Sequence, residues 1–163
     1  QLDAYITENS LHILGEPLNS ENQPEVEWKS GNDFKFQKQY LYRADRGETE
    51  GLNFWGVSEM LALEDGRLII MERYITATSL MDLSSHFNLF VVDPTKAKEG
   101  DELSKKLIYT NKGQSEVLAN YEGMCLGPKL SNGKQTLLVL ADVNNKEGES
   151  ALLNETIQVL TIE

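Results

Sequence analysis

The chain has 163 residues, enough for one domain with a substantial core, and its 40% hydrophobic and 25% charged residues are typical of a globular protein. Its 26 acidic residues outnumber the 15 basic ones, giving a net charge of −11. This argues against nucleic acid as a partner, because binding to phosphate backbones depends on clustered Lys and Arg. The single cysteine, Cys125, excludes an intrachain disulfide, and no apolar stretch reaches the ~20 residues of a membrane-spanning helix.

The N-terminal part predicts two strands separated by a long polar segment. Residues 4–8 form a short, largely apolar run that ends in Glu8, and residues 34–42 alternate apolar and polar side chains, as in a half-exposed strand. Between them, residues 19–32 are polar and contain proline and glycine, which indicates a loop. Because the chain starts just before residue 4, we expect this first strand to lack the preceding strand of its hairpin.

The clearest hairpin signal lies in the middle of the chain. Residues 56–63 and 67–74 are apolar runs joined by Glu-Asp-Gly at 64–66, a typical turn sequence. Apolar segments at 87–93 and 106–110 predict two further strands. Residues 56–110 are therefore expected to form four consecutive antiparallel strands.

A second unit of the same kind follows. Strands are predicted at 122–126, 136–142 and 155–162, with Ser-Asn-Gly at 131–133 as the hairpin turn. The central runs of both units lack polar alternation, which indicates strands buried on both faces.

Stacked sheets bury both faces of a strand, whereas a sandwich buries only one face of each sheet. We therefore expect an all-β fold with β-propeller-type antiparallel four-stranded blades. The chain would form about half a propeller, with roughly three blades, of which the first and last are incomplete.

Carboxylates recur at corresponding points of these units. Glu8, Glu72 and Asp142 each end an apolar run, at intervals of 64 and 70 residues, and Glu59 and Glu122 lie in the neighbouring strands. If the strands are equivalent, these carboxylates converge on one end or on a central channel. Converging carboxylates can bind a hard cation such as Ca²⁺, or they can accept backbone N–H bonds and hold blades together. Both alternatives stay open.

Three segments resemble the phytase-like family, named for the esterase-like activity of phytase. GVSEMLALEDGRLIIMER (56–73) is similar to the family's Ser-Glu-leucine-rich hairpin, closed by Glu-Arg. YEGMCLGPKLSNGKQTLLVLADVNN (121–145) is similar to its C-terminal Glu-Gly-x-x-x-Gly-Pro block, which ends in Asp-x-Asn-Asn. The opening YITENSL (5–11) resembles an earlier Thr-Glu-x-x-Leu strand. The resemblance covers nearly the whole chain and only the C-terminal half of the family's domain.

The resemblance implies that residues 1–163 are the C-terminal part of a phytase-like β-propeller domain. It implies a metal-assisted phosphoester hydrolase, acting on a small phosphoester-like ligand in the periplasm or outside the cell, although this chain shows no signal peptide. A non-catalytic propeller that binds a ligand or a protein is the alternative. The missing N-terminal half or a second copy would cover the exposed blade faces.

The predicted site residues follow from both arguments. For catalysis we expect Glu59, Glu72, Glu122 and Asp142. For Ca²⁺ or another divalent cation we expect Glu8, Glu59, Glu122, Asp142 and Asn144, with no organic cofactor. Arg67 and Arg73 are the predicted substrate-binding residues, and Arg43 and Arg46 are further cationic candidates. Because neighbours in a strand face opposite sides, Arg73 is expected to face the next blade rather than Glu72.

Overall fold

The computed structural model describes an all-β chain. Among the described residues there are ten strands and one short 3-10 helix, η1 (Pro94–Lys96), and none of them forms a helix long and apolar enough to cross a membrane. In the two N-terminal stretches only the backbone is described. The described residues are 2–7, 10–15, 37–47, 52–79, 82–113, 118–142 and 156–162.

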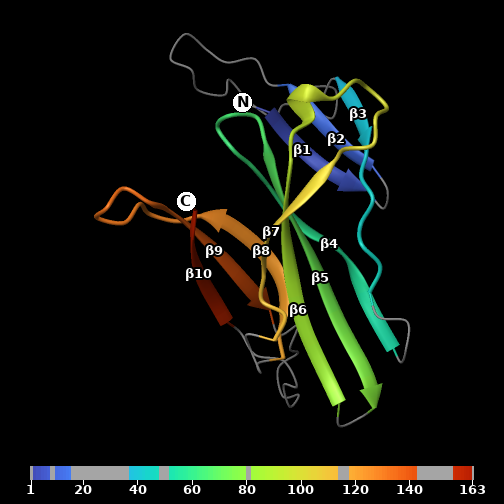
Figure 1. Cartoon of the computed structure of the whole chain (residues 1–163), viewed down its shortest axis with the longest axis vertical. Coiled ribbons are helices and arrows are strands. Elements are labelled where there is room, and N and C mark those ends of the chain that lie inside the picture. The colour runs from blue at the N-terminus through green and yellow to red at the C-terminus, as the bar shows by residue number, and fades with distance from the viewer. Residues whose placement is uncertain are drawn as a thin grey trace, which may run out of the picture.

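The strands form three antiparallel sheets that follow one another along the chain. The first contains β1 (Leu2–Thr7), β2 (Ser10–Gly15) and β3 (Lys38–Leu41). The second contains β4 (Leu52–Ala62), β5 (Leu68–Ser79), β6 (Asp82–Val92) and β7 (Lys105–Thr110). The third contains β8 (Asn120–Leu126), β9 (Gln135–Asp142) and β10 (Thr156–Ile162). Each sheet keeps its strands in chain order, and the second lies between the other two (Figure 1).

The central strand of the second sheet, β5, is buried on both faces, as its unbroken apolar run predicts. On one face of β5, Leu68 and Ile70 pack in a buried cluster with Tyr40 and Tyr42 of the first sheet and the segment that follows it. On the other face, Ile69 and Met71 belong to a second cluster with side chains of the third sheet, among them Leu137, Val139 and Ala141. The two faces of one strand therefore hold the three sheets together.

The two predicted hairpin turns share one geometry. In the first, the Leu63 amide donates to the Arg67 carbonyl (2.8 Å) and Gly66 has φ of 85°. In the second, the Leu130 amide donates to the Lys134 carbonyl (2.9 Å) and Gly133 has φ of 83°. Left-handed backbone at this point favours glycine, which explains why both turns end in Gly.

The first strand differs from its prediction. We expected residues 4–8 to be the second strand of a hairpin without its partner, and therefore Glu8 to match Glu72. Instead β1 pairs with β2 along its whole length and takes the sheet edge that β4 and β8 take in their sheets. Glu8 itself lies outside the described residues. It follows a first strand, whereas Glu72 lies within a second strand, so the two are not equivalent.

The central hairpins are also longer than predicted. β4 begins at Leu52 rather than at Gly56, and the β5–β6 ladder continues through Ile75, Thr76 and Ala77, well past the predicted end of the strand at residue 74. The side chains at the far end of the β5–β6 hairpin are mostly small or polar, so hydrophobic periodicity did not indicate a strand there. Backbone pairing and β-branched residues are enough to continue the ladder.

Candidate functional site

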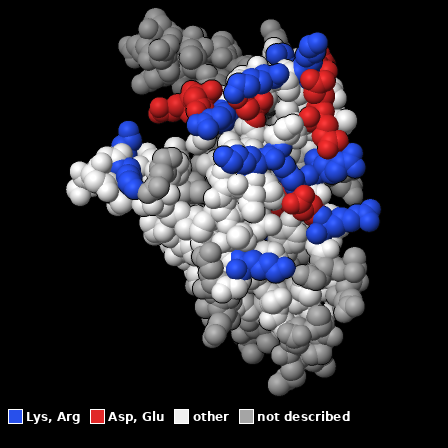
Figure 2. Space-filling model, in the orientation of Figure 1, with Lys and Arg blue, Asp and Glu red and all other residues white. Residues whose placement is uncertain are grey.

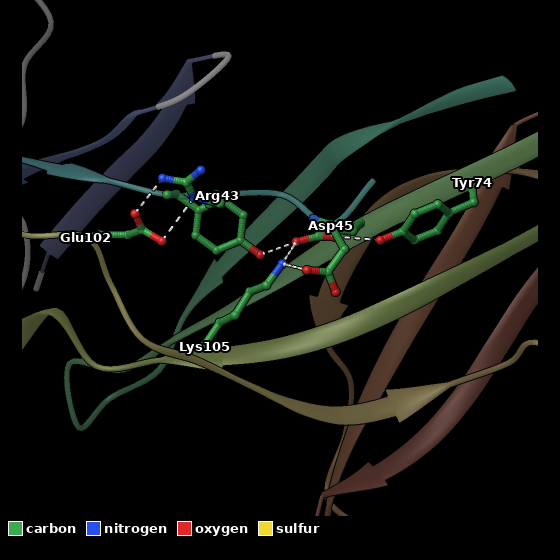
Figure 3. A network of polar contacts seen from close by, with 7 residues as sticks. Arg43, Asp45, Tyr74, Glu102 and Lys105 are labelled. Atoms are coloured by element: carbon green, nitrogen blue, oxygen red, sulfur yellow. Dashed lines mark hydrogen bonds and ion pairs between the residues drawn. The ribbon is translucent and has the colours of Figure 1, made fainter. Parts of the chain in front are cut away.

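Glu72 lies at the centre of a buried polar network that joins the second sheet to the segment after β3. The pleat of β5 places it on the same face as Leu68 and Ile70, and its side chain is 0% exposed. Its Oε1 accepts hydrogen bonds from the Tyr42 hydroxyl and the Lys105 ammonium, both at 2.6 Å. Its Oε2 accepts from the Tyr74 hydroxyl (2.6 Å) and the Asp45 amide (2.9 Å). Figure 3 shows this network, in which Lys105 also pairs with Asp45 at 2.8 Å.

The network has a clear electrostatic signature. Burial raises the pKa of the Tyr42 and Tyr74 phenols well above the usual value for tyrosine, and the hydrogen bonds to Glu72 raise it further. Lys105 extends over the ring of Phe90, with 4.2 Å between its Nζ and the ring centroid. The buried carboxylate is thus balanced by an ammonium group and by phenols that stay protonated.

This arrangement favours the structural alternative for Glu72. A carboxylate offers about four lone-pair positions, and all four are taken by protein donors. No position remains for a metal ion or a water molecule. The bond from the Asp45 amide is the kind of sheet-to-loop contact that we expected of a carboxylate that holds blades together.

Arg73 points to the opposite side of β5, as strand alternation predicts, and contacts the third sheet. Its Nη1 donates to Glu122 Oε1 at 2.7 Å and to Asn120 Oδ1. The Asn120 side-chain amide also donates to Glu122 Oε1, at 2.6 Å. Among the described residues, the hydrogen bonds to the Glu122 carboxylate therefore end on Oε1. The arrangement leaves Oε2 as the oxygen that can accept a proton.

A cavity of about 460 Å³ opens beside this guanidinium, along the free edge of β4. Gly56 is the ladder partner of Arg73, and a Cβ atom placed on Gly56 would meet no atom within 4 Å. The missing side chain therefore leaves open space opposite the guanidinium. We call this cavity the Arg73 pocket; its lining residues are Asn53, Phe54, Trp55, Gly56, Val57 and Arg73.

Two predicted carboxylates lie near Arg73 and its partners. Glu59 follows a β-bulge in β4 and pairs in the ladder with Met71, and its Oε1 accepts the Met60 amide at 2.7 Å. Asp142 ends β9 as the ladder partner of Asn120. The structure therefore brings Glu122 to Arg73 at the junction of the second and third sheets, whereas Asp142 is joined to this site only as the ladder partner of Asn120, and Glu59 lies on the neighbouring strand.

The predicted equivalence of Asp142 with Glu72 is wrong. In β9 the side chains of Val139 and Ala141 pack against the second sheet, whereas Asp142 is exposed. Because successive residues of a strand face opposite sides, Asp142 lies on the face turned away from the preceding sheet. Glu72 faces the preceding sheet. The register of β9 thus differs by one position from the one that the acidic ends suggested.

Other predicted residues lie elsewhere. Arg67 sits at the hairpin turn and pairs with Asp65 at 2.6 Å; it is six residues from Arg73, which is about 20 Å along a strand. Arg43 pairs with Glu102 at 2.9 Å and is not among the described lining residues of the pocket, and Arg46 is exposed. Glu8 and Asn144 lie outside the described residues.

Several contacting residues were not found by sequence reasoning. Tyr42 and Lys105 complete the shell of Glu72, Asn120 orients the Arg73–Glu122 pair, and Trp55 lines the pocket. Trp55 directly precedes the predicted hairpin strand. Its position next to Gly56 was the one feature of the sequence that could have indicated a pocket residue. The other contacts join different strands and carry no local pattern.

The described residues contain no ready-made metal centre: no three His, Cys, Asp or Glu side chains among them are grouped so that they could hold an ion. Asp142 and Glu122 belong to adjacent strands, but Glu122 is engaged by Arg73 and Asn120. The metal prediction that includes Glu8 and Asn144 therefore stays a prediction.

Acidic and basic side chains are mixed over the described surface (Figure 2). Figure 2 shows Lys and Arg interspersed with Asp and Glu on one face, with uncharged areas between them. Among the described residues that line the pocket, Arg73 is the one charged side chain, and it offers a binding group for an anion.

Comparison with protein families identifies the chain's relatives. The family model described as Phytase-like, esterase-like activity of phytase, matches residues 5–145. No curated protein and no solved structure matches the chain significantly.

Proposed function

The chain belongs to the phytase-like family, and we propose that it hydrolyses phosphate esters bound in the Arg73 pocket. One observation carries the proposal. A guanidinium group with a carboxylate bonded to one of its nitrogens stands in the wall of a cavity of about 460 Å³. This combines an anion-binding group with a potential proton acceptor, the two functions that hydrolysis of a phosphate ester needs.

In the proposed complex, Arg73 binds the phosphate group. Arg73 contacts Asn120 and Glu122 through Nη1. A guanidinium presents five N–H donors in a planar fork that matches phosphate oxygens. Glu122 and Asn120 hold the fork in place from the side of the third sheet. A positioned donor of this kind stabilises the negative charge on the phosphoryl oxygens during transfer.

In the proposed hydrolysis, Glu122 acts on the attacking water. Its Oε2 accepts the proton as the water oxygen forms a bond to phosphorus, and the bond from phosphorus to the ester oxygen breaks. The departing alkoxide takes a proton from a surrounding water molecule, and Asp142, the ladder partner of Asn120, remains a predicted contributor. Glu59 remains a predicted contributor on the adjacent strand. Glu72 is assigned a structural role, because protein donors occupy all its positions.

A divalent cation remains a separate proposal. Carboxylates and amide oxygens are suitable ligands for Ca²⁺, but the described residues provide no group that could hold an ion. The hydrolysis above therefore contains no metal step. A site that uses Glu8 or Asn144 would require residues beyond those described.

We also propose that the three sheets are consecutive blades of a β-propeller in an extracytoplasmic protein. Support comes from the family, which is known to be β-propeller, and from the repeated order in which β1, β4 and β8 each begin a sheet. Leu140 and Ile157 face each other across β9 and β10 on the exposed side of the third sheet. The N-terminal half of a longer chain or a second copy would cover this apolar face.

The test is release of inorganic phosphate from p-nitrophenyl phosphate by the full chain, with and without Ca²⁺. We expect Glu122→Gln to lower kcat about 100-fold, because general-base catalysis contributes at least that factor. The Arg73→Gln change should mainly raise KM. Glu64→Gln, the same change at an exposed turn residue, is the matched control and should leave both constants unaltered.

Two outcomes would overturn the proposal. One is the absence of phosphate release with every common divalent ion, which would leave a non-catalytic binding module as the function. The other is a Glu122→Gln variant that keeps the wild-type kcat and pH profile, which would remove Glu122 as the base.

A further inference from the structure

We propose that a second pocket, between the second and third sheets, binds a linear alkyl carboxylate. The carboxylate pairs with Arg67, and the alkyl chain lies between the two sheets. This pocket has a volume of about 410 Å³ and is lined by residues of both sheets; we call it the intersheet pocket. It is separate from the site of the proposed hydrolysis, because Arg67 lies about 20 Å along β5 from Arg73.

The intersheet pocket lies at the side where the last strands of the two sheets face each other. The first strand of the third sheet, β8, lies against β4 and β5, and buried side chains fill the space there. The pocket is found at the other side, between Ile108 of β7 and Leu160 of β10. Protein interiors are close-packed, so an open space of about 410 Å³ is unusual. Its volume is in the range of small-molecule sites.

The walls of the intersheet pocket suit an alkyl chain. Ile69, Leu89 and Leu137 form its floor and are at most 2% exposed, whereas Ile108 at its mouth is 46% exposed. On the second sheet the lining runs from Leu63, which follows β4, across β5 and β6 to β7. Three strand spacings give this apolar surface a length of about 14 Å. A long, narrow apolar surface is best covered by a linear chain, and each buried methylene group favours binding.

One cation stands at the end of this apolar surface. Among the described residues that line the intersheet pocket, Arg67 is the one charged side chain, and the other polar groups are the hydroxyls of Tyr109 and Thr161. Asp65 Oδ2 accepts from Arg67 Nε at 2.7 Å and pairs with Nη2 at 2.6 Å. A guanidinium has five N–H donors, so these contacts leave the donors of Nη1 for a carboxylate. The matching ligand therefore has one negative charge at one end of an apolar chain.

The first experiment measures dissociation constants of the full chain by isothermal titration calorimetry for hexanoate, octanoate, decanoate and hexadecanoate. Each added methylene group should tighten binding about fourfold for as long as the pocket can bury it. The gain should end before hexadecanoate, because that chain is longer than the apolar surface. 1-Octanol should bind about tenfold more weakly than octanoate, because it has no charge to pair with Arg67.

Two pairs of variants locate the site. Ile108→Trp places a large ring in the mouth of the pocket and should abolish binding of decanoate. Leu107→Trp is the matched control, because Leu107 is 50% exposed in the same strand but is not among the described lining residues. Arg67→Gln should weaken octanoate about tenfold and leave 1-octanol unaffected. Its control is Lys134→Gln, since the Lys134 carbonyl accepts from Leu130 in the other hairpin turn as that of Arg67 does from Leu63.

A thermal melt of each variant confirms that it is folded, and the series of chain lengths tests the site on the unaltered protein. Absence of decanoate binding would overturn the proposal, as would an affinity that does not depend on chain length. Equal binding of decanoate by Ile108→Trp and Leu107→Trp would place the ligand elsewhere. If octanoate binds no better than 1-octanol, or if Arg67→Gln binds octanoate as well as Lys134→Gln does, the carboxylate does not pair with Arg67.

Discussion

Replacing Glu72 by glutamine tests the structural role of the buried network most directly. The change keeps size and shape but removes the negative charge. Whichever way the new amide is placed, its NH₂ group faces a donor, because the Lys105 ammonium lies at one oxygen position and the Asp45 amide at the other. At least one buried hydrogen bond is lost, and among the described residues Lys105 keeps Asp45 alone as an ionic partner.

The size of the effect follows from burial. Glu72 is fully buried, and breaking a buried ion pair by removing one partner costs about 3–5 kcal/mol. For a domain of this length, that corresponds to a fall in the unfolding midpoint of roughly 6–20 °C. Since total stability is commonly about 5–15 kcal/mol, a large part of it depends on this one carboxylate.

The measurement is urea and thermal unfolding of the wild type, Glu72→Gln and Glu102→Gln. Glu102 undergoes the same chemical change, but its bond to Arg43 is on the surface, so its midpoint should stay at the wild-type value. If Glu72→Gln has the same unfolding midpoint as the Glu102→Gln control, the network does not hold the sheets together. The structural assignment of Glu72 would then be wrong.

Three further changes have defined outcomes. Burial raises the pKa of Tyr42 above its unfolded value of about 10. Above about pH 10 the free energy of unfolding should therefore fall by about 1.4 kcal/mol per pH unit because of this residue. Tyr42→Phe should make the fall of the unfolding free energy with pH less steep, and an equally steep fall in the variant would contradict the reasoning. Light scattering should show a dimer or larger species that Ile157→Lys converts to monomer, since Ile157 is 66% exposed; a wild-type monomer at every concentration would refute this. Ca²⁺ should raise the melting midpoint relative to a chelator, by the equivalent of about 2.7 kcal/mol at 100 times Kd; an unchanged midpoint would count against a cation site.

Much of the fold could be predicted because its signals are local. The turn glycines Gly66 and Gly133 need left-handed backbone, and the unbroken apolar run of β5 is buried on both faces as predicted. The similar run of β9 is buried on one face only, because Leu140 on its other face is exposed. The side of β5 on which Arg73 lies follows from the pleat alone. The polar ends of the β5–β6 hairpin have no turn glycine or apolar run to mark them, so the predicted strands were too short.

The sequence by itself determined the all-β class, the hairpins, the opposite directions of Glu72 and Arg73, and the family. Only the tertiary structure decided what these two side chains contact. Tyr42, Lys105 and Asn120 reach them from other strands or sheets, so no local period relates them. Bulges in β4 and β8 also shift the pairing by one residue. In a strand, one residue separates one face from the other, which is why the repeated acidic ends turned out to be unlike: a carboxylate buried in a saturated network in β5 and an exposed one in β9.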